Sequence, residues 1–361
     1  MLPKQTTVFQ TKLLGWYCEH KRVLPWRLTN DPYLIWISEV MLQQTQVITV
    51  IPYYQKFVEL FPTVNDLADS DLQQLLKLWQ GLGYYSRARN LHKAAKSIVD
   101  EYQGQFPETY DEVSQLSGVG PYIAAAVSSI AFQLPYAVVD GNVKRVLARL
   151  FCCELPVNDA KNNKQYQTRA DTLLFSDNSG DYNQAIMELG ALICKSQQAD
   201  CVRCPVSEVC QAYDKKQTNM YPFKITKKKS KTREMLSFIV ENKGRLLMFQ
   251  NKETGLLGGL WTFPQFEKKN NETQENMLRQ LIPKSTNGQH FTSIPLASVK
   301  HIYTHFKEDI LPTVVKINDD STLTAQQQSL KWVTLTQLKK LPITGACQKI
   351  LHLYQEYKKT A

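Results

Sequence analysis

The sequence predicts two regions of different fold class, a mainly α region followed by a smaller α+β region. From residue 5 to about 213, apolar residues recur at intervals of three and four, and Gly or Pro interrupts the pattern about every 15 to 25 residues. From about residue 234 the pattern changes to short alternating segments, which are typical of strands. The first two strands should join at Asn242-Lys243-Gly244, and helices are expected near 272–282 and 346–358. Between them, KITKKKSKTR (residues 224–233) carries six basic residues and no acid. We therefore expect domains at 1–223 and 234–361, joined by a basic linker at 224–233.

Composition limits the class of protein and of partner. The chain has 361 residues, 43 Lys and Arg against 33 Asp and Glu, and a net charge of +10, which favours a polyanionic partner such as nucleic acid or an anionic membrane. An apolar run of the ~20 residues that a membrane span needs is absent, so no membrane-spanning segment is expected. The N-terminal stretch does not read as a signal peptide. Eight cysteines without such a signal indicate a reducing compartment, the cytoplasm, where thiols bind metals.

Four cysteines near the middle of the chain indicate a metal site. Their spacing is C-x6-C-x2-C-x5-C, and the residues are Cys194, Cys201, Cys204 and Cys210. Zinc sites usually show two short pairs or a histidine pair, and no histidine lies between residues 93 and 289. The looser spacing favours a [4Fe–4S] cluster. Zinc and a group of buried thiols without metal stay as alternatives.

A helix expected to start after Asp31 carries a candidate acid. In LPWRLTNDPYLIWISEVMLQQTQV (residues 24–47), Asp31 is a natural N-cap and Pro32 a natural first helical residue. Helical spacing then places Glu39, Gln43 and Gln46 on one face. Glu39 is either a solvated glutamate or a carboxyl at the edge of a pocket, where desolvation raises its pKa so that it donates a proton.

Two further segments are candidates for DNA contact. In LSGVGPYIAAAV (residues 116–127), Gly118, Val119 and Gly120 predict a tight turn between helices whose amides suit a phosphate, as in a helix–hairpin–helix. In GLGYYSRARNLHKAA (residues 81–95), aromatic residues alternate with basic ones, a pattern that suits wedging between bases and holding phosphate. The alternatives are an ordinary helix–helix turn and an ordinary helix start.

A second carboxyl follows in YAVVDGNVKRVLARL (residues 136–150). Asp140 precedes Gly141 and Asn142 at the start of a basic helix, where amide donors and the helix dipole favour the anion. The alternative is a plain turn or N-cap. One ionised and one protonated carboxyl in a pocket is the arrangement that breaks glycosidic bonds, so Glu39 and Asp140 form the candidate pair.

Taken together and in this order, these segments resemble adenine DNA glycosylases of the MutY family, within the endonuclease III superfamily. The resemblance implies a helix–hairpin–helix six-helix barrel at about 26–135, a [4Fe–4S] lobe built from 1–25 and 136–213, and a C-terminal Nudix-like (MutT-like) domain that recognises 8-oxoguanine. GGLWTFPQFE resembles the start of a Nudix fold, but the REx2EE metal-binding core is absent. Pyrophosphate hydrolysis by this domain is therefore not expected.

The resemblance also implies a reaction and its residues. The enzyme would flip out and excise adenine paired with 8-oxoguanine or guanine in double-stranded DNA; Glu39 would protonate adenine N7 and Asp140 would stabilise the oxocarbenium ion, with Asn142 and Tyr122 beside them. The implied adenine pocket is Trp26, Arg27, Leu42 and Gln184, the implied DNA contacts are Gln44, Tyr84, Arg87, Gly118, Val119, Gly120 and Lys144, and the implied lesion-sensing residues are Tyr303, Thr304 and His305. We also expect one [4Fe–4S] cluster at the four cysteines and a cation at the helix–hairpin–helix. The protein is expected to be a monomer without a membrane partner, located in a bacterial cytoplasm beside the nucleoid.

Two other functions compete with this one. A bifunctional pyrimidine glycosylase and lyase of the same superfamily carries a nucleophilic lysine at the position of Tyr122, and a tyrosine cannot form the Schiff base that strand cleavage needs. A non-enzymatic DNA-binding module on an iron–sulfur scaffold would make no use of Glu39. Both are disfavoured by the residues that occupy the two carboxyl positions and position 122.

Overall fold

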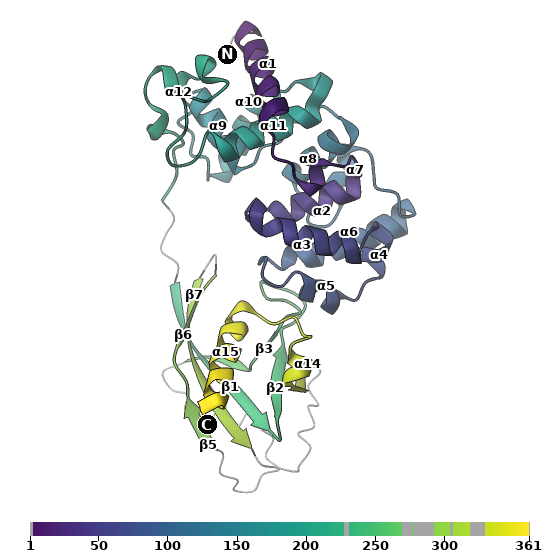
Figure 1. Ribbon diagram of the computed structural model, residues 1–361, viewed down its shortest axis with the longest axis vertical. Helices are drawn as coiled ribbons and strands as arrows, with labels where there is room; N and C mark the ends of the chain where they lie inside the picture. The colour runs from purple at the N-terminus through teal and green to yellow at the C-terminus, as the bar shows by residue number, and fades with distance from the viewer. Residues whose placement is uncertain are drawn as a thin grey trace. The chain divides into compact units, whose positions relative to one another are not determined.

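The chain forms two compact units that do not follow the sequence order. The computed structural model (Figure 1) describes residues 3–226, 231–268, 277, 292–303, 306–317 and 329–360. One unit comprises Met1–Asp69 and Asn90–Lys227, and the other comprises Ser70–Arg89 and Lys228–Ala361. The second unit thus includes a segment from the middle of the α region. The contiguous domain boundaries drawn from the sequence stay a prediction.

The first unit is built from helices, as the sequence predicts. They are α1 (Pro3–His20), α2 (Pro32–Leu42), α3 (Val47–Leu60), α4 (Val64–Asp69), most of α6 (Ser86–Tyr102), α7 (Tyr110–Gln115), α8 (Pro121–Phe132), α9 (Gly141–Leu150), α10 (Asn163–Asp171), α11 (Ser179–Leu192) and α12 (Gln211–Asp214). Among the described residues, none of the helices has the length and apolar character required to cross a membrane.

Helix α2 begins where the sequence predicts and ends earlier. The Asp31 carboxylate accepts a hydrogen bond from the Tyr33 amide at 2.8 Å, and Pro32 is the first helical residue. After Leu42 the chain leaves the helix, because Gln43 is non-helical and Gln44 has a φ of 56°, in the left-handed region. The prediction that Glu39, Gln43 and Gln46 share one helical face is therefore wrong. Gln46 instead precedes α3 as its N-cap residue.

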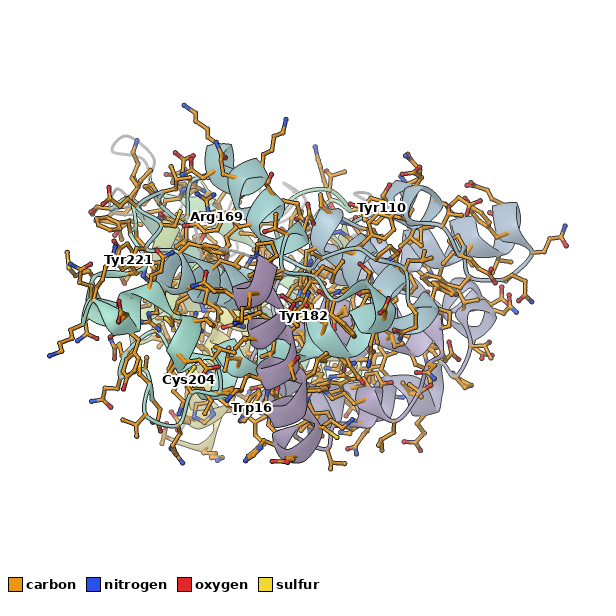
Figure 2. All side chains as sticks on the ribbon, turned by 90° about the horizontal axis from the view of Figure 1, so that it is seen from above. Trp16, Tyr110, Arg169, Tyr182, Cys204 and Tyr221 are labelled. Carbon is orange, nitrogen blue, oxygen red and sulfur yellow. The ribbon has the colours of Figure 1, made fainter. Side chains whose placement is uncertain are left out.

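Helices α2 and α8 form the core of the first unit. Most of their side chains are buried, which is typical of helices that are apolar around most of their circumference. Tyr182 of α11 packs against α1, with its ring edge-on to Phe9 at 6.4 Å between centroids (Figure 2). The buried amide of Asn183 accepts from the Val138 amide and donates to Ser129 Oγ. These contacts hold α11 against α8 and against the segment that leads into α9.

Helices α9 and α11 are in close contact at Gly190. A Cβ atom on Gly190 would lie 2.7 Å from Asn142 Cβ and 3.3 Å from its backbone, which is tighter than real contacts allow. Asn142 lies in the first turn of α9, directly after Asp140 and Gly141. The absence of a side chain at position 190 therefore sets where the start of α9 sits against α11.

The second unit contains α5 (Leu72–Leu78) and an α+β domain built on one sheet. Its strands are β1 (Lys231–Asn242), β2 (Arg245–Gln250), β3 (Trp261–Thr262), β4 (Gln265–Glu267), β5 (Thr292–Pro295), β6 (Val299–Ile302), β7 (Phe306–Ile317) and β8 (Leu330–Thr334), followed by α14 (Leu335–Leu338) and α15 (Gly345–Thr360). Strands β1 and β7 pair in parallel along their whole length, and the other pairs are antiparallel. The order is β3-β2-β1-β7-β5.

Local signals in the C-terminal part give the predicted elements. Lys243 and Gly244, with φ of 47° and 73°, turn β1 into β2 as expected for a two-residue hairpin. β1 already begins at Lys231, so the last residues of the predicted linker are strand. The helix predicted at 346–358 is α15. The helix predicted near 272–282 lies outside the described residues, apart from Met277.

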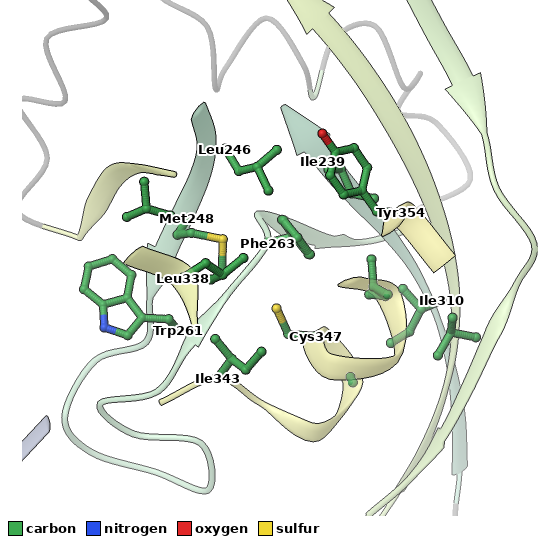
Figure 3. Close-up of a cluster of buried hydrophobic side chains, with 14 of the residues drawn as sticks. Ile239, Leu246, Met248, Trp261, Phe263, Ile310, Leu338, Ile343, Cys347 and Tyr354 are labelled. Carbon is green, nitrogen blue, oxygen red and sulfur yellow. The ribbon is translucent and has the colours of Figure 1, made fainter. Parts of the chain in front are cut away.

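One face of this sheet is covered by the C-terminal helices. Figure 3 shows Leu246, Met248 and Phe263 facing Leu338 of α14 and Cys347 of α15. All five are almost completely buried. Trp261 also belongs to this core, and packing within the core fixes the position of its side chain.

We expect Gly190→Ala to lower the free energy of unfolding by about 1–3 kcal/mol, because the new methyl group must displace Asn142 or separate α9 from α11. Chemical denaturation measures this. Gly141→Ala is the matched control, since a Cβ there meets no atom within 4 Å, and it should be neutral or slightly stabilising. Equal stability of the Gly190→Ala and natural proteins would contradict the packing described.

Candidate active site

A cavity of about 150 Å³ lies in the first unit. Its lining includes all the residues that the sequence assigned to catalysis and to the adenine pocket, namely Trp26, Arg27, Glu39, Leu42, Tyr122, Asp140, Asn142 and Gln184. They come from α2, α8, α9, α11 and the turn Pro25–Arg27, so the fold brings together segments far apart in the chain. Their roles stay predictions, but their common location is a structural finding.

Glu39 contributes a buried carboxyl to this cavity. Its side chain projects from α2, and the residue is only 5% exposed. Tyr122 Oη donates a hydrogen bond to Glu39 Oε2 at 2.6 Å. Burial raises the pKa of Glu39 from 4.5 to about 7, although the hydrogen bond from Tyr122 acts in the opposite direction. At neutral pH this group therefore exists in both the acid and the anion form.

Asp140 sits at the N-cap of α9 and is surrounded by donors. Its carboxylate accepts from the Val143 amide at 2.7 Å and from Asn142 Nδ2 at 2.9 Å. These hydrogen bonds favour the anion, as the sequence leads one to expect. Burial acts more strongly, however, and the net effect raises the pKa of Asp140 above its ordinary value.

A chain of hydrogen bonds leads from Asp140 to the cysteine-rich segment. Arg145 Nη2 donates to Asn142 Oδ1 at 2.9 Å and to the Gly190 carbonyl at 2.7 Å, and Arg145 Nε donates to the Cys194 carbonyl at 2.8 Å. Asn142 in turn donates to Asp140. Arg145 was not predicted from the sequence, where it is one basic residue among several on α9.

A second carboxyl missed by the sequence analysis lines the same cavity. Glu188 accepts from Arg22 Nε and Nη2 at 2.7 Å each and from Arg27 Nη2 at 2.9 Å. Burial raises its pKa, but the hydrogen bonds from the two arginines prevail and lower it to about 2. Glu188 lies one helical turn after Gln184 on α11, and that spacing was the signal that could have identified it.

The four predicted metal ligands line one further pocket. Cys194, Cys201, Cys204 and Cys210 surround it together with Arg149. Arg149 Nη1 donates to Cys194 Sγ at 3.2 Å, while its Nε donates to the carbonyls of Thr218 and Tyr221. Within the described residues no set of three or more His, Cys, Asp or Glu side chains converges as a site for a single metal ion. Four cysteine side chains around one pocket, with a guanidinium that donates to one of the sulfurs, suit a group bound by several sulfurs.

The predicted DNA contacts of the first unit lie on three elements. Gly118, with a φ of 77°, Val119 and Gly120 form the turn between α7 and α8, and a Cβ at position 118 would lie 2.5 Å from Asn90 Cβ. Gln44 lies in the turn after α2 and is left-handed. The Lys144 ammonium donates to Asn163 Oδ1 at 2.6 Å, so it is engaged within the unit. The cation expected at the α7–α8 turn stays a prediction.

The other predicted contacts lie in the second unit. Tyr84 has a φ of 48°, and the guanidinium of Arg87, a buried residue, stacks over its ring. Tyr303 follows β6, with its ring 4.5 Å from that of His301 and 4.6 Å from that of Phe306. Burial raises the pKa of Tyr303. Thr304 and His305 lie outside the described residues.

Comparison with known proteins places both parts of the chain. Residues 37–167 match the HhH-GPD superfamily of base excision DNA repair proteins, and residues 236–353 match the NUDIX domain. An adenine DNA glycosylase of Buchnera aphidicola is 33% identical over 97% of this chain and 98% of its own length. One from Rattus norvegicus is 31% identical over 98% of this chain and 79% of its own length. A thermostable thymine-DNA glycosylase is structurally similar, with a TM-score of 0.54 and 31% identity over 59% of this chain and 98% of its own.

We expect Glu39→Gln to stabilise the protein at alkaline pH. Because the folded state raises the pKa of Glu39, the contribution of this group to stability is largest below pH 4.5 and is lost as pH rises to about 7. The rise from 4.5 to about 7 corresponds to about 3 kcal/mol, which glutamine avoids since it carries no charge. The difference in unfolding free energy between the two proteins should therefore open between pH 4.5 and about 7 and then stay constant.

Denaturation curves at several pH values measure this difference. The control is Glu59→Gln, on an exposed side chain of α3, which should show no such opening. A Glu39→Gln protein whose stability relative to wild type does not change with pH would show that burial leaves the pKa of Glu39 near its ordinary value.

Proposed function

This chain belongs to the family of adenine DNA glycosylases, and we propose that it excises adenine paired with 8-oxoguanine or guanine from double-stranded DNA without cutting the strand. The observation that carries the proposal is one cavity that contains two carboxyls in different environments. Glu39 is buried and accepts a hydrogen bond from Tyr122, whereas Asp140 accepts one from Asn142 and one from the Val143 amide. Such a pair suits cleavage of a glycosidic bond.

The first step is entry of the base into the cavity. A glycosidic bond inside a duplex is inaccessible, so the adenosine must leave the stack. We assign Trp26, Leu42 and Gln184 to the walls that receive the adenine, since they line the cavity around Glu39. The Arg27 guanidinium is paired with Glu188, and this pairing holds the wall beside them.

Protonation of the base follows. Glu39, with a pKa of about 7, gives its proton to adenine N7, and the C1′–N9 bond breaks with its electron pair leaving on the base. The carboxylate that results accepts the hydrogen bond from Tyr122 Oη, which stabilises the anion at the moment it forms. Tyr122 thereby favours transfer of the proton away from Glu39.

Asp140 acts on the sugar. Bond cleavage leaves positive charge on the deoxyribose, and the anion of Asp140 stabilises it, either across space or by forming a bond to C1′ that water later breaks. Asn142 holds Asp140 in place through its 2.9 Å hydrogen bond. Tyr122 occupies the position where a lyase would carry its lysine, so this cavity supplies no amine for a Schiff base.

The remaining assignments concern the DNA and its setting. The turn Gly118–Gly120 and Lys144 would hold phosphates, Gln44 and Tyr84 would fill the space left by the flipped base, and the Tyr303–His305 hairpin would read the opposite base. Gln44 and Tyr84 are both left-handed, a conformation that costs energy in residues other than glycine and often marks functional positions. We expect a monomer in a bacterial cytoplasm.

We propose that the four cysteines hold one [4Fe–4S] cluster. They line one pocket, and the guanidinium of Arg149 lies beside Cys194. The bound cluster would supply a covalent cross-link of residues 194–210 rather than any step of base removal. Lys195 and Arg203 lie within that cross-linked segment and would face the DNA backbone. Arg203 is paired with Asp200, so we expect Lys195 to make the stronger contact with the DNA backbone.

Asp140→Asn tests the mechanism. We expect its single-turnover rate of adenine release from an A:8-oxoguanine duplex to fall at least about 100-fold, because the charge that stabilises the sugar cation is lost. DNA binding should persist. Asp159→Asn, at a half-buried cap outside the cavity, should release adenine at the wild-type rate. Near-wild-type release by Asp140→Asn would contradict the mechanism, and strand cleavage or release from a thymine-glycol duplex would favour the lyase.

Cys201→Ser tests the cluster. Iron content per protein molecule should fall to a small fraction of the wild-type value, and DNA affinity or folding should weaken before base release does. Cys18→Ser, on an exposed side chain of α1, should retain its iron. A soluble, iron-free Cys201→Ser protein with wild-type affinity and activity would contradict the role given to the cluster.

A further inference from the structure

The segment Ser70–Arg89 is bound to the C-terminal domain by side-chain hydrogen bonds within the second unit. Gln73 Nε2 donates to the Gly259 carbonyl at 3.1 Å, and Trp261 Nε1 donates to Gln73 Oε1 at 2.9 Å. Arg89 donates from Nη1 to the Gly258 carbonyl and from Nη2 to the Gly255 carbonyl. Lys77 donates to the Leu341 carbonyl and Gln80 accepts from the Ile343 amide, at 3.1 and 3.4 Å.

Gln73 and Arg89 bind the turn Gly255–Trp261, and the shape of this turn depends on its glycines. Gly255 and Gly259 have φ of 88° and 75°, which other residues rarely adopt. A Cβ on Gly258 would lie 2.3 Å from the Glu253 carbonyl oxygen, and one on Gly259 would lie 3.0 Å from Leu76 Cδ1 of α5. The close approach of α5, and the direction in which the carbonyls of Gly255, Gly258 and Gly259 point, therefore depend on the absence of side chains at these glycines.

The bound segment ends in a rigid loop that presents Tyr84. Gly81, Gly83 and Tyr84 all have positive φ, so the loop turns sharply. Trp79 Nε1 donates to the Gly83 carbonyl, and Arg87 donates to the carbonyls of Leu82 and Gly83 while its guanidinium stacks over the rings of Trp79 and Tyr84. Arg87 was expected from the sequence to contact DNA. Its guanidinium and that of Arg89 instead donate to carbonyls of this unit.

We infer that Gln73 and Arg89 are specificity-determining positioning residues: by binding the turn Gly255–Trp261, they make the Tyr84 loop part of the unit that reads the base opposite adenine. This inference rests on the proposed function. Tyr84 and Tyr303 both belong to the second unit, whereas the cavity with Glu39 and Asp140 belongs to the first. Loosening the Tyr84 loop should therefore affect the choice of opposite base more than bond cleavage.

The variants that test this remove the hydrogen bonds and keep the shape or charge. Gln73→Leu loses both of its bonds, Trp261→Phe keeps a ring and loses the donor, and Arg89→Lys keeps the charge but cannot donate to both carbonyls from one planar group. The matched control is Gln74→Leu, since Gln74 is the next residue of α5 and is exposed. Single-turnover rates on A:8-oxoguanine and A:G duplexes give the ratio that measures selectivity.

We expect Gln73→Leu and Arg89→Lys to lower this ratio by roughly threefold to tenfold, the effect of losing one or two hydrogen bonds, with the A:G rate nearly unchanged. Gln74→Leu should keep the wild-type ratio. Adding Trp261→Phe to Gln73→Leu should lower the ratio no further, because the hydrogen bond that Trp261 donates to Gln73 is already lost in Gln73→Leu. An unchanged ratio in Gln73→Leu, or an equal fall in Gln74→Leu, would overturn the inference.

A second readout does not depend on the reaction. Hydrogen exchange of the amides in residues 79–85 should become at least about threefold faster in Gln73→Leu than in Gln74→Leu, because the segment opens more readily from the turn. Equal exchange would overturn the inference even if adenine is released. Wild-type protein that shows no adenine release would instead refute the proposed function, and the exchange experiment would still decide whether the segment is bound as described.

Discussion

The burial of the Glu39 carboxyl is the interaction on which the active site depends. Helices α2 and α8 are apolar around most of their circumference, so the Glu39 carboxyl between them is buried, and Tyr122 donates a hydrogen bond of 2.6 Å to it. The result is a carboxyl with a pKa of about 7, able to give up a proton at neutral pH. The same burial costs the folded protein stability, a common consequence of building a functional group into a core.

The surroundings of Glu39 keep other charges from neutralising this effect. Arg22 and Arg27 bind Glu188 on the cavity wall, so their charge is compensated there rather than at Glu39. Asp140 is held by Asn142 and the Val143 amide, and through Asn142 and Arg145 it connects to the backbone of Cys194. The cysteine-rich segment thus helps to fix the second carboxyl, while the second unit holds the Tyr84 loop.

Local signals predicted much of this and long-range contacts did not. The comparisons confirm the family and the fold class, and the caps at Asp31 and Asp140 and the turn at Lys243-Gly244 gave their elements correctly. The end of α2 was missed because neither Gly nor Pro marks it. Glu188, Arg145 and Arg149 were missed since most of their hydrogen-bond partners lie 45 or more residues away in the chain. For the same reason periodicity could not show that Ser70–Arg89 belongs with the C-terminal domain.

The most direct test of the central claim is the pH dependence of single-turnover adenine release by the wild-type and Tyr122→Phe proteins. If buried Glu39 is the acid, the wild-type rate should fall as pH rises through about 7. The hydrogen bond from Tyr122 lowers the pKa of Glu39, so its removal should shift that fall to higher pH. A rate that stays constant from pH 6 to 9, or a fall that moves to lower pH in Tyr122→Phe, would contradict the account.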